Sequence, residues 1–177
     1  MMSRMQNITG HWLASLRHYF MMCLLLSSPE RLPYNPYAFA ITVVAYFLLG
    51  LFFVDENYSY AVITARILIE MALLATIARL GLALKNYPNR FPQTFSALVG
   101  INLVMTLAAI PLQGLFTAGA DGSSAAANLI FILFMVWNLA AISLVFKRAF
   151  EISISLSAMI SFSYFVANLI IEVLLLR

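Results

Sequence analysis

Hydrophobic residues occur along this chain in long runs that are separated by short polar connections. The runs cover residues 37–54, 61–84, 95–118, 128–146 and 152–176. A helix rises about 1.5 Å per residue, so about 20 apolar residues cross the hydrocarbon core of a bilayer, which is about 30 Å thick. The pattern therefore predicts an all-α fold, a polytopic membrane helix bundle with five transmembrane helices.

The N-terminal region has a different pattern, with polar residues between apolar ones that recur at helical spacing. These apolar positions are Ile8, Trp12, Leu16, Tyr19, Phe20 and Cys23. The uncharged run after His18 is too short to cross a bilayer, so residues 8–26 are predicted to form an amphipathic helix at the membrane interface. We expect Trp12, Arg17 and Phe20 to be its interfacial anchors.

Helix-capping residues divide the chain into two regions. The segment Ser28–Glu30 has serine, proline and glutamate in the order that favours the start of a short helical turn. Asn35 is a suitable N-cap for the first span, and Pro36 is tolerated at its first helical position. We therefore expect a cytoplasmic N-terminal region at residues 1–34 and a transmembrane domain at residues 35–177.

Composition and charge indicate a membrane protein and predict its orientation. Of the 177 residues, 63% are hydrophobic and 10% are charged, and the mean hydropathy is +0.94, which excludes an ordinary soluble domain. Basic residues concentrate in cytoplasmic loops of membrane proteins. With a cytoplasmic N-terminus, the bases on that side are Arg4, Arg17, Arg31, Lys85, Arg90, Lys147 and Arg148, against Arg177 alone outside. The net charge of +3 thus reflects topology and attraction to anionic lipid headgroups, without a nucleic-acid partner.

The second predicted span carries three charged residues inside an apolar run. Arg66 and Glu70 lie four residues apart on one helix face, so an ion pair within the helix is the simplest arrangement. Arg79 lies near the end of the span, where its side chain can reach the interface as an anchor. Charges at this depth rarely face lipid. Helix packing and an ion or ligand pathway both remain open as explanations of the pair.

The fifth predicted span carries a polar stripe along one helix face. Its members are Ser153, Ser157, Ser161, Tyr164, Asn168 and Glu172, spaced three or four residues apart. Small and hydroxylated residues allow close helix packing, so a packing seam is one interpretation and a hydrophilic path is the other. Counted from the helix ends, Glu172 lies at a depth similar to that of Arg66.

The polar residues of different spans are predicted to converge. Asn168 and Gln113 fall in the half of the bundle that is outside under this topology, and Glu70 and Asn138 fall nearer its middle. We therefore expect an intramembrane polar core of Arg66, Glu70, Gln113, Asn138, Asn168 and Glu172.

Signatures of enzymes, metal sites and cofactor sites are absent from the sequence. His11 and His18 have no nearby carboxylate with which to complete a metal site. Ser157 and Ser161 have no histidine base at membrane depth. Cys23 is the only cysteine, so an intramolecular disulfide is impossible. We expect no catalytic residues, metal or cofactor.

The order of elements resembles the Yip family of Rab-interacting membrane proteins, over residues 30–177. The segment Asn89–Phe95, NRFPQTF, is similar to the basic, aromatic and Gln-Thr stretch that precedes the third span in that family. The chain has Pro33–Tyr37 where eukaryotic members carry an acidic-Leu-Tyr/Trp-Gly-Pro motif, so the resemblance is to bacterial relatives in the inner membrane. It implies a scaffold that binds partners and has no catalytic residues.

Two functions follow from these patterns. Short loops without catalytic groups indicate a non-enzymatic scaffold or accessory subunit, with the lipid bilayer, other membrane proteins or a homo-oligomer as partners. The alternative is a small oligomeric transporter or channel that uses Arg66, Glu70 and Glu172.

Overall fold

The protein folds into a bundle of helices, and no strand occurs among the residues described. The computed structural model describes residues 2–32, 35–52, 59–115 and 124–175. The long helices are α1 (Met2–Cys23), α2 (Pro36–Phe52), α3 (Tyr60–Leu84), α4 (Phe91–Ala109), α6 (Ala125–Phe150) and α7 (Ile154–Leu175). Short 3₁₀ turns are η1 (Pro29–Arg31), η2 (Pro88–Arg90) and η3 (Ile110–Leu112).

Four helical segments in the described residues are long and apolar enough to cross a membrane. They are α3, the segment Pro88–Leu115 that contains α4, α6 and α7. These segments support the prediction of an integral membrane protein. Helix α2 is apolar but shorter, with 17 residues, which corresponds to about 26 Å. A fifth span at α2 and an interfacial position for α1 therefore remain predictions.

Several helix boundaries differ from those predicted. Helix α4 begins at Phe91 instead of residue 95, because the preceding turn η2 leads directly into it. Helix α6 covers residues 125–150 instead of 128–146, since two bases suit the negative end of its dipole and Glu151, with φ of 54°, ends it. The predicted boundaries at residues 54, 118 and 176 lie outside the described residues.

The caps at the start of α2 agree in part with the sequence. The side chain of Asn35 accepts a hydrogen bond from the backbone N–H of Tyr37 at 2.9 Å, as an N-cap does. Turn η1 begins at Pro29, but the hydroxyl of Ser28 does not cap it.

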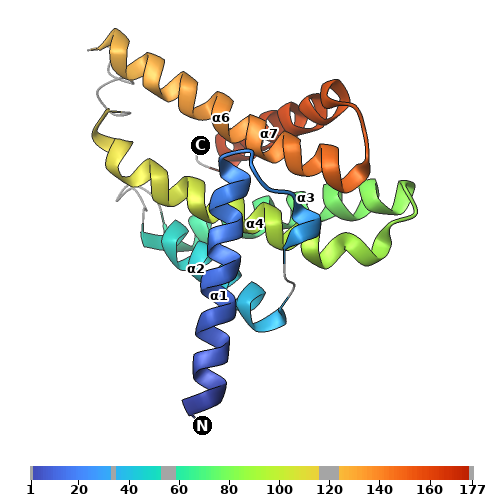
Figure 1. Cartoon of the computed structure of the whole chain (residues 1–177). Helices are drawn as coiled ribbons and strands as arrows, with labels where there is room; N and C mark the ends of the chain where they lie inside the picture. Colours follow the sequence, from blue (N-terminus) through green and yellow to red (C-terminus); the bar gives the residue numbers. More distant parts are fainter. Residues whose placement is uncertain (1, 33–34, 53–58, 116–123, 176–177) are drawn as a thin grey trace.

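Helix α4 is the central helix of the bundle. Half of its apolar window is buried, compared with 11–28% in the other three candidate spans. It contacts α1, α2, α3 and α6, while α6 and α7 pack along each other as a hairpin. The α3–α4 and α6–α7 turns lie at the same end of the bundle, on the right in Figure 1. The helices of the bundle thus assemble around α4.

The end of α1 is buried against the middle of α4. The ring of Tyr19 lies on the backbone of Gly100, where a Cβ atom would meet it, and its hydroxyl is 2.8 Å from Oγ of Ser96. Trp137 of α6 donates a hydrogen bond of 2.7 Å to the carbonyl oxygen of Cys23. The first turns of α1 extend away from the other helices (Figure 1). The second half of α1 is therefore held in the bundle.

This contact predicts that a methyl group on α4 will expose the lone cysteine. Cys23 is fully buried, and burial raises the pKa of its thiol to about 12, so it should react slowly with maleimide. The substitution Gly100→Ala should displace Tyr19. If the substitution weakens the docking of α1 by about 1.4 kcal/mol, a cost ordinary for overpacking, Cys23 should be exposed about ten times as often. Its labelling should then be about tenfold faster.

The matched control is Gly114→Ala, because a Cβ atom at Gly114 meets nothing within 4 Å. Equal labelling rates in the two variants would contradict the docking of α1 on α4.

Candidate functional site

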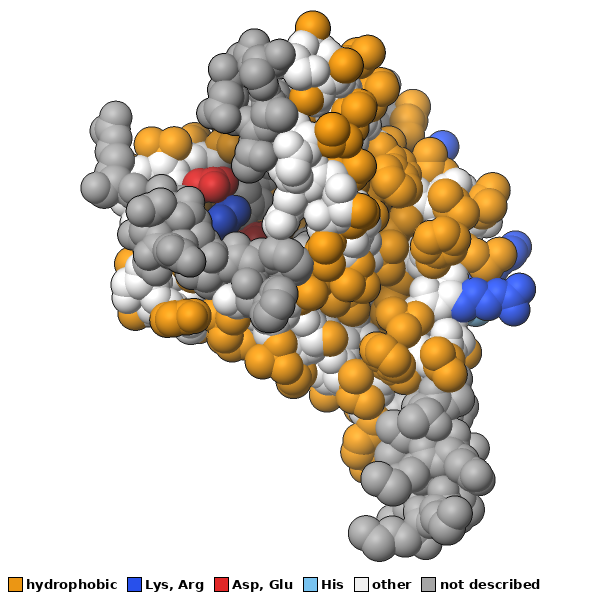
Figure 2. All heavy atoms as spheres, turned by 90° about the vertical axis from the view of Figure 1, so that its left-hand side faces the viewer, with side chains coloured by type: hydrophobic (Ala, Val, Ile, Leu, Met, Phe, Trp, Pro, Cys, Tyr) orange, Lys and Arg blue, Asp and Glu red, His pale blue; other side chains and the backbone are white. Residues whose placement is uncertain are grey.

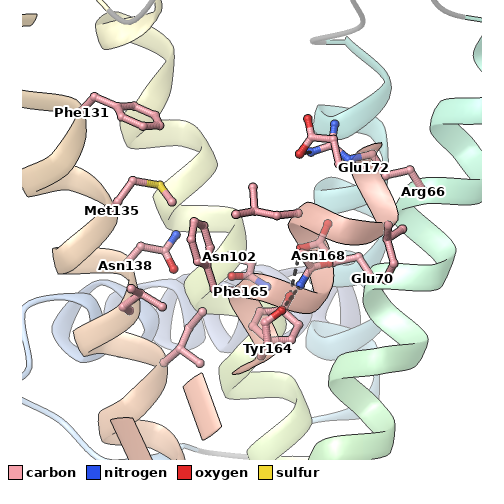
Figure 3. Close-up of a pocket in the computed structure, with 14 residues that line it drawn as sticks. Arg66, Glu70, Asn102, Phe131, Met135, Asn138, Tyr164, Phe165, Asn168 and Glu172 are labelled. Atoms are coloured by element: carbon pink, nitrogen blue, oxygen red, sulfur yellow. Dashed lines mark hydrogen bonds and ion pairs between the residues drawn. The ribbon is translucent and has the colours of Figure 1, made fainter. Parts of the chain in front are cut away.

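A polar pocket lies between α3, α4, α6 and α7. Its volume is about 410 Å³. The polar and charged residues that line it are Arg66, Glu70, Asn102, Asn138, Tyr164, Asn168 and Glu172 (Figure 3). Figure 2 shows acidic and basic side chains next to one another in a hollow of a largely hydrophobic face. The pocket thus brings together charged side chains from α3 and α7.

Arg66 pairs with Glu172 of α7 and not with Glu70 of its own helix. Nη2 of Arg66 lies 3.4 Å from Oε2 of Glu172, and each side chain is about 40% exposed. Figure 3 shows these two side chains side by side at one end of the pocket. The ion pair within α3 that the spacing predicted is therefore replaced by an ion pair between helices, because the carboxylate of Glu70 is bound elsewhere.

Glu70 accepts hydrogen bonds from two tyrosines on neighbouring helices. The hydroxyl of Tyr46 on α2 donates to Oε1 at 2.9 Å, and the hydroxyl of Tyr164 on α7 donates to the same oxygen at 3.2 Å. Hydrogen bonds to a carboxylate in a water-poor site offset part of its desolvation cost. Glu70 therefore connects α2, α3 and α7 through one oxygen atom.

Three asparagines complete the polar lining. Asn102 comes from α4 and is 8% exposed, and Asn138 comes from α6. Asn168 of α7 donates from Nδ2 to the carbonyl oxygen of Tyr164 at 3.0 Å. Gln113, which the sequence placed in the same polar core, is not among the lining residues. Asn138 and Asn168 do line the pocket together with the three charged residues.

Sequence reasoning missed Tyr46 and Asn102. Tyr46 lies in the middle of an otherwise apolar run, and a phenol at that position requires a hydrogen-bond partner. Asn102 is likewise an isolated amide inside α4. Each was a detectable signal, because Thr42 lies four residues before Tyr46 and Thr106 lies four residues after Asn102 on the same helix faces.

The polar stripe of α7 divides into two parts. Ser157 and Ser161 are buried against α6, where Oγ of Ser157 lies 3.1 Å from Oγ of Ser143 and Ser161 donates to the carbonyl oxygen of Leu139 at 3.0 Å. Tyr164, Asn168 and Glu172 face the pocket instead. Ser153 is exposed and accepts a hydrogen bond from the N–H of Leu156. The stripe is thus a packing seam at one end and a pocket wall at the other.

The residues predicted as anchors lie at the surface of the bundle, except for one. Arg17, Phe20 and Arg79 are exposed. Trp12 is partly buried, and its indole N–H has no hydrogen-bond partner among the described residues. Their role as membrane anchors remains a prediction.

The pocket has the chemistry of a site that can bind a polar ligand. Its lining offers carboxylates, amides, a phenol and a guanidinium. In the described part of the chain, no group of three His, Cys, Asp or Glu residues is placed to hold a metal ion. The arrangement can hold a polar ligand by charge and hydrogen bonds.

The ion pair predicts unequal rescue of an Arg66 variant. An exposed pair contributes about 1 kcal/mol or less, and 1 kcal/mol shifts the melting temperature of a protein of this size by about 2–4 °C. Arg66→Leu should lower the melting temperature in detergent by about that amount. Adding Glu172→Leu should restore most of the loss, because it removes the carboxylate that is left unpaired.

Adding Glu70→Leu to Arg66→Leu should restore nothing, since it leaves two tyrosine hydroxyls without their acceptor. Arg79→Leu, at an exposed arginine of the same helix, is the control. Better rescue by Glu70→Leu than by Glu172→Leu would favour the pair within the helix.

Comparisons with protein-family models, with curated proteins and with solved structures find no match to this chain.

Proposed function

We propose that this protein binds a small organic cation in the pocket between α3, α4, α6 and α7, and that it acts as a small oligomeric transporter. The observation that carries the proposal is the gathering of Arg66, Glu70 and Glu172 around one cavity. Ionisable residues within membrane segments commonly mark a solute or ion pathway.

The charge of the lining selects a cation. One arginine and two glutamates give a formal charge of +1 − 2 = −1. Glu172 is paired with Arg66, so the charge of Glu70 is the one left without a basic partner among the described residues. Both tyrosines donate to Oε1 of Glu70, and we propose that Oε2 binds the cation. A bound monocation would make the site neutral.

The aromatic lining favours an organic cation over a hydrated inorganic ion. Phe131, Tyr164 and Phe165 line the same pocket as Glu70 (Figure 3). The face of an aromatic ring attracts ammonium groups, with about 0.5–2 kcal/mol per contact. The side-chain oxygens of the asparagines can accept hydrogen bonds from a primary ammonium group. The lining therefore fits a small amine.

The remaining parts of the proposal come from the sequence. We place the N-terminus in the cytoplasm and the C-terminus outside on the distribution of basic residues. We place the protein in a bacterial inner membrane on its resemblance to bacterial Yip-like proteins. A homo-oligomer would supply the further walls that a complete path needs. The scaffold role and the resemblance to the Yip family remain predictions, without a contact in this structure that favours them.

Ligands of equal shape test the charge preference. We expect tert-butylammonium to raise the melting temperature of the purified protein, whereas neutral tert-butanol and anionic pivalate do not. Glu70→Gln should weaken binding at least tenfold, because it removes the unpaired charge. Glu30→Gln, at the opposite end of the bundle, should leave binding unchanged. Equal effects of the three ligands would overturn the cation site.

Flux measurements test the transport role. Liposomes that contain only this protein should take up labelled methylguanidinium, an organic cation with N–H donors that stays charged at neutral pH, and Glu70→Gln should abolish the uptake. Absence of uptake by the unmodified protein would overturn transport. Reproducible co-purification of other proteins from native membranes, together with absent uptake, would favour the scaffold.

A further inference from the structure

A second pocket lies at the opposite end of the bundle, where α6 turns into α7. It is formed by the connection after α1, turn η1, the last turn of α6 and the α6–α7 turn, and its volume is about 520 Å³. Three bases line it, namely Arg31, Lys147 and Arg148, together with Glu30 and Glu151. We call these residues the basic pocket. None of them takes part in the polar pocket.

The two acids of the basic pocket are already bound by another arginine. Nη1 of Arg90 donates to Oε1 of Glu151 at 2.8 Å and lies 3.5 Å from Oε1 of Glu30. The hydroxyl of Tyr87 donates to Oε2 of Glu151 at 2.9 Å. The hydrogen bonds from Arg90 and Tyr87 lower the pKa of Glu151, so the carboxylate stays charged and held by these partners.

The three bases of the basic pocket have no such partner. Among the described residues, Arg31, Lys147 and Arg148 form no ion pair. Counting Arg90, four bases and two acids leave a formal charge of +4 − 2 = +2. The dipole of α6 explains bases in its last turn, but it does not explain Arg31 on η1. The excess charge is therefore available to an anion.

Exposed leucines lie next to this positive charge. Leu24, Leu25 and Leu26 follow α1 directly, and their exposed fractions are 43%, 42% and 69%. Leu26 itself lines the basic pocket. Positive charge beside exposed leucines is the arrangement expected where a protein surface meets both the headgroup layer and the acyl chains.

We propose that the basic pocket binds the phosphate headgroup of an anionic phospholipid, with the acyl chains beside Leu24–Leu26. Arg31 and Arg148 would hold the phosphate oxygens from two separate elements, η1 and α6. Guanidinium groups suit this role because they donate paired hydrogen bonds to phosphate oxygens. The site requires both the charge of the headgroup and the apolar chains, which separates it from a site for free phosphate.

The test compares lipids on the purified full-length protein. Phosphatidylglycerol should raise its melting temperature and remain bound in native mass spectrometry, whereas phosphatidylcholine of the same chains and inorganic phosphate should do neither. Arg31→Gln with Arg148→Gln should lose most of the bound phosphatidylglycerol. The control, Arg17→Gln with Arg79→Gln, removes the same charge at two exposed arginines that are predicted interfacial anchors but line no part of the pocket, so the loss of bound phosphatidylglycerol should be much smaller.

A second pair of variants guards against simple misfolding. Arg31→Lys with Arg148→Lys keeps the charge and should retain most of the lipid. Equal loss in the pocket and control variants would reduce the effect to overall charge and overturn the proposal. Stabilisation by inorganic phosphate alone would assign the pocket to a free anion and would also overturn it, as would equal binding of the two lipids.

Discussion

The cost of placing charged residues inside an apolar helix governs how this bundle is assembled. Arg66 and Glu70 lie on α3, and each needs a polar partner that α3 itself does not provide. Glu172 of α7 serves the first, and hydroxyls from α2 and α7 serve the second. These contacts bring α2, α3 and α7 together, and the polar pocket lies beside them, between α3, α4, α6 and α7.

Close packing on α4 sets where those helices lie. The absence of a side chain at Gly100 lets Tyr19 approach the helix backbone, so the end of α1 lies across the middle of α4. In the α6–α7 hairpin, the small side chains of Ser157 and Ser161 lie against α6 and form hydrogen bonds with it. Small residues at these contacts allow short distances between backbones, which positions the larger polar side chains farther along each helix.

The two ends of the bundle differ in chemistry for a physical reason. At one end, four helices line the polar pocket, where Arg66 pairs with Glu172 and Glu70 has no basic partner among the described residues. At the other end, Arg90 binds Glu30 and Glu151, which joins the α3–α4 turn, η1 and the α6–α7 turn. Because both carboxylates are bound by Arg90, the positive charges of Arg31, Lys147 and Arg148 are not neutralised by them.

The sequence alone determined the helical class, the apolar segments and the N-cap at Asn35, because each depends on residues close together in the chain. It also identified most of the charged and amide residues of the polar pocket. Only the tertiary structure decided that Arg66 pairs with Glu172 and that Tyr46 binds Glu70. Helical periodicity describes the faces of one helix, whereas these partners depend on which faces of different helices meet. That choice depends on packing between helices, such as that of Ser157 and Ser161 of α7 against α6, which local pattern does not reveal.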